Sequence, residues 1–557
     1  MPRASTILML LAAAAITVLV AVPVVFILLQ AVFPDFTRGS LAGAFSRLDV
    51  LTENARLLRQ TRNSLMLSAA VMLGALIVGG PIGVLRGMFR VPFARVWDVI
   101  FLIPFMIPPF IAAIAWMMTL QPRGYLFRLA GFDLGGFLFS FAGLAFVITL
   151  NLFPLVYFAV SRALELVGGR FASAARIAGA GPVRAFWLIT LPLATPAIAA
   201  SLLIVFAMSI EEFGTPAALA ARTGFDVLVT GIYLRLSDYP IDLSGAALGS
   251  VILMVLAVSA FFLQNFIATR RSFISQTGKP ASVDKPELGP WRLPVLALFA
   301  LVAAIGVVIP LSAIVLTSLM GTISGGPSAA NLTLRHYEAI FAEGSRAVEA
   351  LRISGWLAFL TALAAGAIGA VVAVIVVRGT GRGRHIIDAL SILPNAIPSI
   401  VLAVGIILAW NSPFLPVTIY GTAAILLVAY TAILLPFPIR YAVARLRQIG
   451  PSLDDAARVS GASEARVISH ILLPLMAPSL IAAMMLVFAI ASRELVSSIM
   501  LAPAGMRTVG TFVFAQFEQG SVQTGMAMSV VAIAVTSTIM MAVNIWLARR
   551  GAGAFSG

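Results

Sequence analysis

Residues 173–196 read SAARIAGAGPVRAFWLITLPLATP, and residues 455–478 read DAARVSGASEARVISHILLPLMAP. The two stretches align without a gap at an offset of 282 residues. A second pair, LIPFMIPPFI at 102–111 and ILPNAIPSIV at 392–401, aligns at an offset of 290 residues. It matches Pro104 with Pro394 and Pro108 with Pro398, and we expect these prolines to break their helices. The chain is therefore predicted to contain two copies of one structural unit.

Long apolar segments lie on both sides of these stretches and recur along the chain. Of the 557 residues, 61% are hydrophobic and 11% are charged, whereas about a quarter of the residues of a soluble domain are charged. A run of about 20 apolar residues can cross a bilayer as a helix. Six such segments are predicted in each half, at 8–33, 63–88, 97–118, 137–160, 196–218 and 244–267, then 293–319, 353–377, 388–410, 418–440, 478–500 and 524–547. The predicted fold class is an all-α polytopic membrane protein.

The two copies are predicted to run in the same direction through the membrane. Six spans are an even number, so the second copy starts on the same side as the first, and the repeats are parallel. Residues 271–290 are polar and contain Pro and Ser. They are predicted to be a cytoplasmic linker between a first six-span domain at 1–270 and a second at 291–557.

Basic residues indicate the orientation. Arginines and lysines gather in the segments after the even-numbered spans, although the basic segment 47–62 is an exception. The positive-inside rule then places both termini in the cytoplasm. It also accounts for the formal net charge of +15 without a nucleic-acid partner. The apolar stretch after Met1-Pro2-Arg3 resembles a signal peptide but is too long for one, so we expect it to be a retained first span.

Groups that could perform chemistry are scarce. The chain has no cysteine and three histidines that lie far apart in sequence, so disulfides and cysteine or histidine metal clusters are not expected. No Ser/His/Asp arrangement occurs within the predicted spans, and the glycine-rich run 379–383 lacks the Lys and Ser/Thr of a phosphate-binding loop. We predict no catalytic residue, no metal site and no ATP site in this chain.

The duplicated loop between spans four and five has a clear local logic. Ala-Ala-Arg favours a helix, and Gly179 and Gly461 can each provide the turn that ends one short helix and starts another. Pro192 and Pro474 are expected to mark the return of the chain toward the bilayer. The prediction is a short helix at the membrane surface with small residues on one face.

This loop resembles the EAA loop of binding-protein-dependent ABC importer permeases, whose pattern is Glu-Ala-Ala, three residues, Gly, and a later Leu-Pro. The resemblance covers both halves and implies the type I ABC importer transmembrane fold, most similar to the ferric-iron importer permeases. It implies that the loop docks into an ATPase subunit. The residues it assigns to docking are Ser173, Ala174, Ala175, Arg176 and Gly179 in the first copy, and Asp455, Ala456, Ala457, Arg458 and Gly461 in the second.

The resemblance also implies the partners. Two docking loops imply two copies of a cytoplasmic ABC ATPase, which would hold ATP and Mg, and a periplasmic binding protein would deliver the cargo. The chain would be a multi-pass protein of a bacterial inner membrane. Ser173 replaces the expected acid in the first copy, whereas Asp455 keeps a negative charge, so we expect an asymmetric docking interface.

Four charges near the predicted outer ends of spans five and eleven occupy matched positions. Glu211 and Glu212 align with Arg493 and Glu494 at the offset of 282 residues. Charges within spans are costly and are often functional. They could line the translocation path or its outer gate, or they could be structural partners that hold the helix ends together.

The cargo is weakly specified by the sequence. Ferric iron is the leading prediction because the Glu-Phe-Gly-Thr-Pro run at 212–216 and the fused double permease resemble the ferric-iron importer permeases. The alternatives are 2-aminoethylphosphonate, thiamine or a polyamine in the same kind of machine. A secondary transporter with six-plus-six repeats would share the span count, but it would not need the duplicated loops.

Overall fold

The computed structural model describes residues 3–46, 54–167, 179–270, 285–379, 381, 383–415 and 418–549. These residues form helices joined by turns, together with one isolated bridge between Arg90 and Glu287 and no strand of a sheet. The all-α class predicted from the sequence is confirmed.

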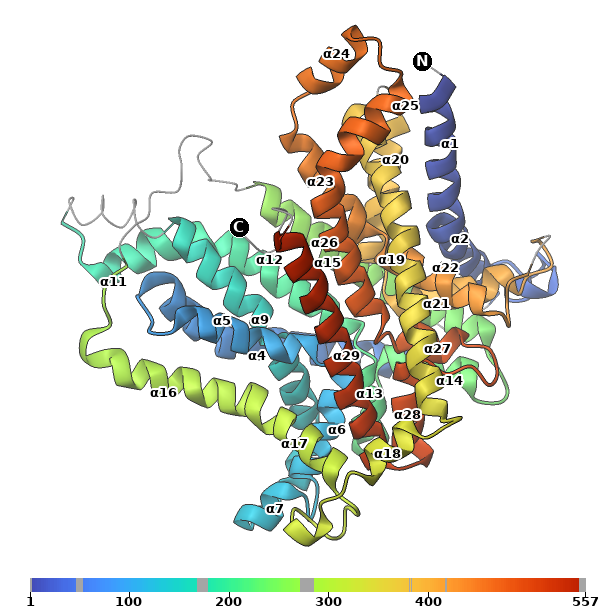
Figure 1. Cartoon of the computed structure of the whole chain (residues 1–557). Coiled ribbons are helices and arrows are strands. Elements are labelled where there is room, and N and C mark those ends of the chain that lie inside the picture. Colours follow the sequence, from blue (N-terminus) through green and yellow to red (C-terminus); the bar gives the residue numbers. More distant parts are fainter. Residues whose placement is uncertain are drawn as a thin grey trace. The chain divides into compact units, whose positions relative to one another are not determined.

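The helices of the first half begin and end as follows (Figure 1): α1 (Arg3–Ile16), α2 (Val22–Val32), α4 (Ala55–Met88), α5 (Ala94–Met106), α6 (Pro109–Leu120), α7 (Tyr125–Ala130), α8 (Gly135–Leu138), α9 (Phe141–Val167), α11 (Pro182–Ala185), α12 (Leu191–Ile210), α13 (Gly214–Thr223), α14 (Leu228–Ser237) and α15 (Leu243–Arg270). Those of the second half are α16 (Arg292–Ala303), α17 (Ile309–Leu319), α18 (Arg335–Phe341), α19 (Arg346–Arg378), α20 (Gly383–Ile392), α21 (Ser399–Trp410), α22 (Ala423–Leu434), α23 (Pro436–Gln448), α24 (Ser452–Val459), α25 (Glu464–Val467), α26 (Leu473–Ala491), α27 (Val496–Leu501), α28 (Val509–Gln519) and α29 (Val522–Arg549).

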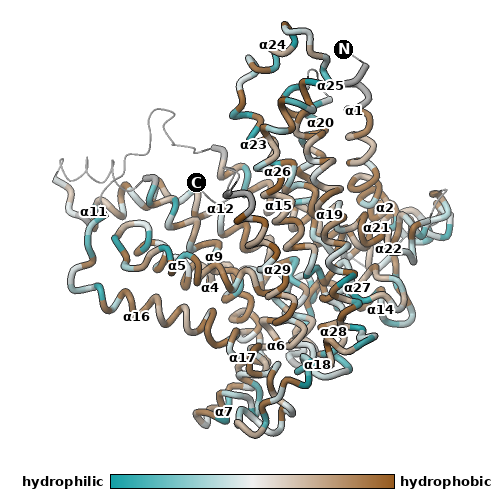
Figure 2. The backbone as a smooth tube through the Cα atoms, in the orientation of Figure 1, coloured by the Kyte–Doolittle hydropathy of each residue, from teal (hydrophilic) through white to brown (hydrophobic). Residues whose placement is uncertain are grey.

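Nine helices within the described residues are long and apolar enough to cross a membrane. Three further bent helix pairs raise the number to twelve if each pair is one span. Each of the twelve overlaps one of the predicted segments. Figure 2 shows the long helices α16, α19, α26 and α29 mostly in the colours of apolar residues, while hydrophilic colours gather on α24 and on the turns between helices.

The fifth and eleventh spans differ from their predicted bounds. They cover Val183–Ile210 and Glu464–Ala491, whereas the sequence predicted 196–218 and 478–500. Each helix begins in a polar turn that a hydropathy window excludes, and each ends before the matched charges because the backbone turns there. Pro192 and Pro474 therefore lie inside continuous spans. The prediction that they mark the return of the chain toward the bilayer is wrong, because each span already begins several residues earlier.

Four prolines share one local structure. A π-turn ends two residues before Pro23, Pro192, Pro310 and Pro474, in the first and fifth spans of both halves; the π-turns are Thr17–Ala21, Phe186–Thr190, Ala304–Val308 and Ile468–Leu472. Proline has no N–H to donate within a helix and its ring clashes with the preceding turn. A wider turn before the proline absorbs this misfit, and its recurrence supports the predicted repeat.

The chain forms two compact units, and each unit draws on both halves of the sequence. One unit contains residues 1–53, 232–254 and 332–557, and the other contains 54–231 and 255–331. In the first unit α1 packs against α19, and α2 packs against α21. In the second unit α17 packs against α6. Each half thus gives its first span to the unit that holds the later spans of the other half. The division into domains at 1–270 and 291–557 follows the sequence repeat, and it stays a prediction.

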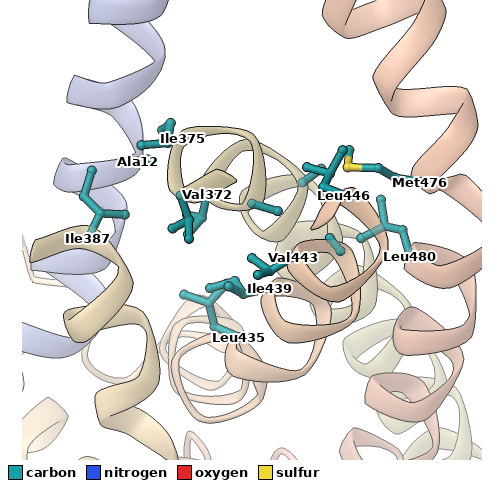
Figure 3. Close-up of a cluster of buried hydrophobic side chains, with 14 of the residues drawn as sticks. Ala12, Val372, Ile375, Ile387, Leu435, Ile439, Val443, Leu446, Met476 and Leu480 are labelled. Atoms are coloured by element: carbon teal, nitrogen blue, oxygen red, sulfur yellow. The ribbon is translucent and has the colours of Figure 1, made fainter. Parts of the chain in front are cut away.

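The first unit has a core of aliphatic side chains from α1, α19, α20, α23 and α26. Figure 3 shows Val372, Ile439 and Val443 converging from α19 and α23, with Ala12 and Ile387 on one side and Met476 on the other. Contact between apolar side chains alone gains little in a membrane, because the lipid tails are equally apolar. Close packing of these side chains must therefore supply much of the attraction between the helices.

Matched glycines bring the second span of each half close to the fourth. A Cβ atom at Gly79 of α4 would lie 3.0 Å from the backbone N of Tyr157 on α9, and a Cβ at Gly369 of α19 would lie 3.1 Å from the N of Ile439 on α23. Gly79 and Gly369 align at the offset of 290, and Tyr157 and Ile439 align at 282. Small residues permit such backbone approach between helices in membranes, so the two halves share one helix crossing.

Candidate functional site

The second docking loop is a helix–turn–helix of very short elements. α24 carries Asp455, Ala456, Ala457 and Arg458, and α25 follows after a tight turn. Gly461 in that turn has a φ of +83°, a backbone conformation that suits glycine. The N–H of Gly461 donates to the Arg458 carbonyl at 2.9 Å, and the N–H of Ala462 donates to the Ala457 carbonyl at 2.9 Å. These bonds close the helix end as in a glycine C-cap, so the predicted turn at Gly461 is confirmed.

The exposed face of α24 has the character expected of a docking surface. Val459 is 90% exposed, Leu453 is half exposed, and Ala456 is exposed. The Asp455 carboxylate lies 3.2 Å from the Arg458 guanidinium, with 70% of the Asp455 side chain exposed. A surface pair of this kind contributes little stability, so it leaves Asp455 available to a partner. The docking role of these residues stays a prediction.

Most of the first docking loop lies outside the described residues. Ser173, Ala174, Ala175 and Arg176 belong to that part of the chain. Gly179 is described and has a φ of +86°, close to the value at Gly461. The two loops therefore share their glycine turn.

The matched glutamates lie in identical turns after α12 and α26. The N–H of Glu212 donates to the Ser209 carbonyl at 3.3 Å, and the N–H of Glu494 donates to the Ala491 carbonyl at 3.3 Å. Ser209 and Ala491 are matched at the offset of 282 residues. The turns end the fifth span of each half.

Both carboxylates hold the start of the next helix. Glu212 Oε1 accepts from the Thr215 N–H at 3.0 Å in the first turn of α13, and Glu494 Oε1 accepts from the Ser497 N–H at 3.1 Å in the first turn of α27. A carboxylate at a helix N-terminus satisfies free N–H groups and complements the helix dipole. This helix-capping role was not predicted from the sequence. The available signal was a Glu followed three residues later by Thr or Ser at the matched positions. Glu211 and Arg493 precede these capping residues.

The Glu494 turn is further fixed by its neighbours in the second half. The Ser498 hydroxyl donates to the Glu494 carbonyl at 2.9 Å, and Tyr430 bonds the Ser498 hydroxyl. A Cβ atom at Gly510, near the start of α28, would lie 2.8 Å from the Glu494 carbonyl oxygen. α28 therefore rests directly on this turn.

The matched prolines break the third span of each half, as predicted. The helix axes bend by 95° between α5 and α6 and by 111° between the α20 segment and α21. In the first half, the Asn151 side-chain amide donates to the Pro104 carbonyl at 2.7 Å and to the Ile107 carbonyl at 3.2 Å. Backbone carbonyls freed at membrane depth need such partners. The two carbonyls at the bend of the first half therefore have a hydrogen-bond donor within the protein.

A charge network at the end of α4 was not predicted. Arg86 pairs with Asp98 at 2.8 Å and with Glu165 at 2.8 Å, and Lys285 pairs with Glu165 at 2.8 Å. Asp98 aligns with Asp388 at the offset of 290, and Asp388 pairs with Arg440 at 2.9 Å. The matched aspartates were the available sequence signal. Among the described residues, no group of three or more His, Asp or Glu side chains is placed to hold a metal ion.

The helices and turns described so far define a polytopic membrane protein built from two copies of a permease-like repeat. The family described as "Binding-protein-dependent transport system inner membrane component" matches residues 79–273 and 362–552. The chain belongs to this family, and it is a multi-pass inner-membrane transport subunit.

Individual relatives cover most of the chain at modest identity. The "Ferric transport system permease protein FbpB" of Actinobacillus pleuropneumoniae is 26% identical over 498 residues, covering 85% of this chain and 70% of the relative. The "Putative ferric transport system permease protein FbpB 1" of Haemophilus influenzae is 27% identical over 464 residues, covering 78% and 71%. The "Putative 2-aminoethylphosphonate transport system permease protein PhnV" of Salmonella paratyphi A is 30% identical over 149 residues, covering 27% and 56%.

Proposed function

We propose that this chain is the membrane subunit of an ATP-driven importer that moves ferric iron delivered by a periplasmic binding protein. The observation that carries the proposal is the exposed helix α24 with its glycine turn at Gly461, repeated at Gly179. Each loop receives one copy of a separate cytoplasmic ABC ATPase, and ATP and Mg bind to those subunits. Both termini lie in the cytoplasm, in keeping with the distribution of basic residues.

The coverage of the named relatives favours iron over the other cargoes. Two relatives that cover 85% and 78% of the chain are named as ferric transport permeases, whereas the phosphonate permease matches 27% of it. Membership of a binding-protein-dependent family argues against a secondary transporter, because such a carrier needs no docking loops.

The cargo is tested with proteoliposomes that contain the chain and its ATPase. The periplasmic binding protein of the proposed importer is loaded with ferric iron, and uptake of labelled iron is measured with and without ATP. We expect ATP-dependent iron uptake that a large excess of 2-aminoethylphosphonate does not inhibit. Uptake of 2-aminoethylphosphonate in place of iron would assign the alternative cargo and refute the iron proposal.

The glutamate turns belong to the proposed translocation path, and their negative charge is the property to test. In a Glu212→Gln/Glu494→Gln double variant, each side chain keeps the oxygen that accepts from Thr215 or Ser497. The helix caps therefore persist while two charges are removed. If the charges guide a cation, uptake should fall roughly ten-fold or more, about 1.4 kcal/mol, while ATP hydrolysis in the complex continues.

The matched control removes the cap as well as the charge. A Glu212→Met/Glu494→Met variant has no side-chain acceptor, so it should lose thermal stability as well as uptake. If the glutamine variant transports like the wild type while the methionine variant is unstable, the two carboxylates are helix caps alone and their place in the path is wrong.

A further inference from the structure

We propose that the ion pair between Arg378 and Asp454 links the docking helix α24 to α19 and passes its movement to the Glu494 turn. The inference rests on the proposed docking of α24 to an ATPase. Arg378 and Asp454 lie outside the EAA-like motif, and we assign them a positioning role.

The pair is short and largely withdrawn from water. Arg378 Nε donates to Asp454 Oδ2 at 2.5 Å, and the same guanidinium donates to the Ile449 carbonyl at 2.9 Å. The Asp454 side chain is 2% exposed and that of Arg378 is 16% exposed. A buried pair contributes little net stability, but removal of one partner is costly because the other charge is left buried. Such a pair holds two elements in one relative position.

Asp454 anchors α24 by an ion pair, beside Ala457, which is partly buried against the core of the unit. All residues of α24 are described, and Asp454 is the one among them that is buried. The helix otherwise extends beyond the ends of the long helices of its unit (Figure 1). A partner that moves α24 therefore also displaces the Asp454 carboxylate and, through it, acts on Arg378.

Arg378 is the last residue of a helix suited to carry that movement. α19 runs for 33 residues from Arg346 to Arg378 and contains no proline and no π-turn. A helix of this length extends about 50 Å. A regular helix transmits displacement along its axis, and α19 lacks the π-turns of the first and fifth spans.

Two contacts connect the N-terminal part of α19 to the turn at Glu494. Ser354 Oγ accepts from the Val509 N–H, the first residue of α28, at 2.8 Å. The next residue, Gly510, lies against the Glu494 carbonyl. A continuous series of contacts therefore runs from Asp454 through Arg378, α19 and α28 to Glu494, all within one compact unit.

The first half repeats the far end of this series but lacks the link. Ser64, matched to Ser354, accepts from the Leu228 N–H at 2.8 Å. The position matched to Arg378 is Met88, and the position matched to Asp454 is Ala172. Neither side chain can form an ion pair. The link between Arg378 and Asp454 is therefore specific to the second half. It adds a structural reason for the expected docking asymmetry to the difference between Ser173 and Asp455.

Charge reversal tests the link in the complete complex with the ATPase and binding protein. Arg378→Asp and Asp454→Arg should each leave the ATPase bound and hydrolysing. Uptake per ATP hydrolysed should fall roughly five- to hundred-fold, the range typical of coupling between two sites. The Arg378→Asp/Asp454→Arg double variant should recover most of the wild-type ratio, and Arg378→Lys should keep an intermediate one.

The control is a second pair in the same unit, Arg440 with Asp388. Arg440→Gln should reduce thermal stability without a change in uptake per ATP. If both single reversals keep the wild-type uptake per ATP hydrolysed, the inference is wrong. ATP-dependent uptake by the wild type would then still support the proposed function. Loss of ATPase binding in the single variants without recovery in the double would also overturn it. Absence of ATP-dependent uptake in the wild type would instead refute the proposed function.

Discussion

Replacing Gly461 with proline should reduce ATP-coupled uptake to background while leaving membrane insertion and protein abundance unchanged. The backbone at Gly461 has a φ of +83°, which proline cannot adopt because its ring fixes φ near −65°. Proline would also remove the N–H that donates to the Arg458 carbonyl. α24 could not end where it does, and its exposed face would be presented to the ATPase in the wrong orientation. Uptake and ATPase binding are measured on the same membranes.

Gly131 supplies the matched control for this substitution. It ends α7 with a φ of +76°, and its N–H donates to the Phe127 carbonyl at 2.8 Å. Gly131→Pro therefore disturbs an equivalent helix end outside the docking loops, and uptake should persist. Gly461→Asn, which tolerates the left-handed region, should retain most of the activity. Wild-type uptake by Gly461→Pro would show that the turn is not needed for coupling.

Replacing Gly369 with leucine should prevent assembly of a stable transport subunit, and Gly79→Leu should act in the same way. A Cβ atom at Gly369 would lie 2.7 Å from Pro438 Cβ, and a Cβ at Gly79 would lie 2.6 Å from the Phe153 carbonyl oxygen. Neither neighbour can move without separating the helices, so an overpacking cost of about 1–3 kcal/mol or more is expected. The thermal unfolding midpoint and the yield of monodisperse detergent-solubilised protein report the loss.

Gly355 on the same helix controls for the added bulk. A Cβ at this position meets no atom within 4 Å, so Gly355→Leu should leave stability and yield close to those of the wild type. Equal stability of Gly369→Leu and Gly355→Leu would contradict the view that the glycine crossing of α19 and α23 holds the fold.

Local patterns in the sequence were enough to predict the spans, the repeat and the breaks. Apolar runs of fixed length must be helices in lipid, because no water is present to satisfy the backbone. Proline chemistry predicted the bends after Pro104 and Pro394, and a glycine before a second short helix predicted the positive φ at Gly461. These features depend on neighbouring residues alone.

Features that depend on distant partners were missed. No local signal shows that the first span of each half packs in the unit of the other half, since any apolar helix face suits many neighbours. The capping bonds of Glu212 and Glu494 required knowledge of where α12 and α26 end. Arg378 and Asp454 are separated by 76 residues, and nothing in their surroundings in sequence pairs them.

We propose that ATP is hydrolysed on a separate subunit, while this chain forms the transport path. The test is the rate of ATP hydrolysis by the purified chain alone, by its partner ATPase alone, and by the assembled complex with loaded binding protein. We predict no hydrolysis by the chain alone and stimulated hydrolysis in the complex. Sustained hydrolysis by the isolated chain, free of contaminating ATPase, would contradict the account.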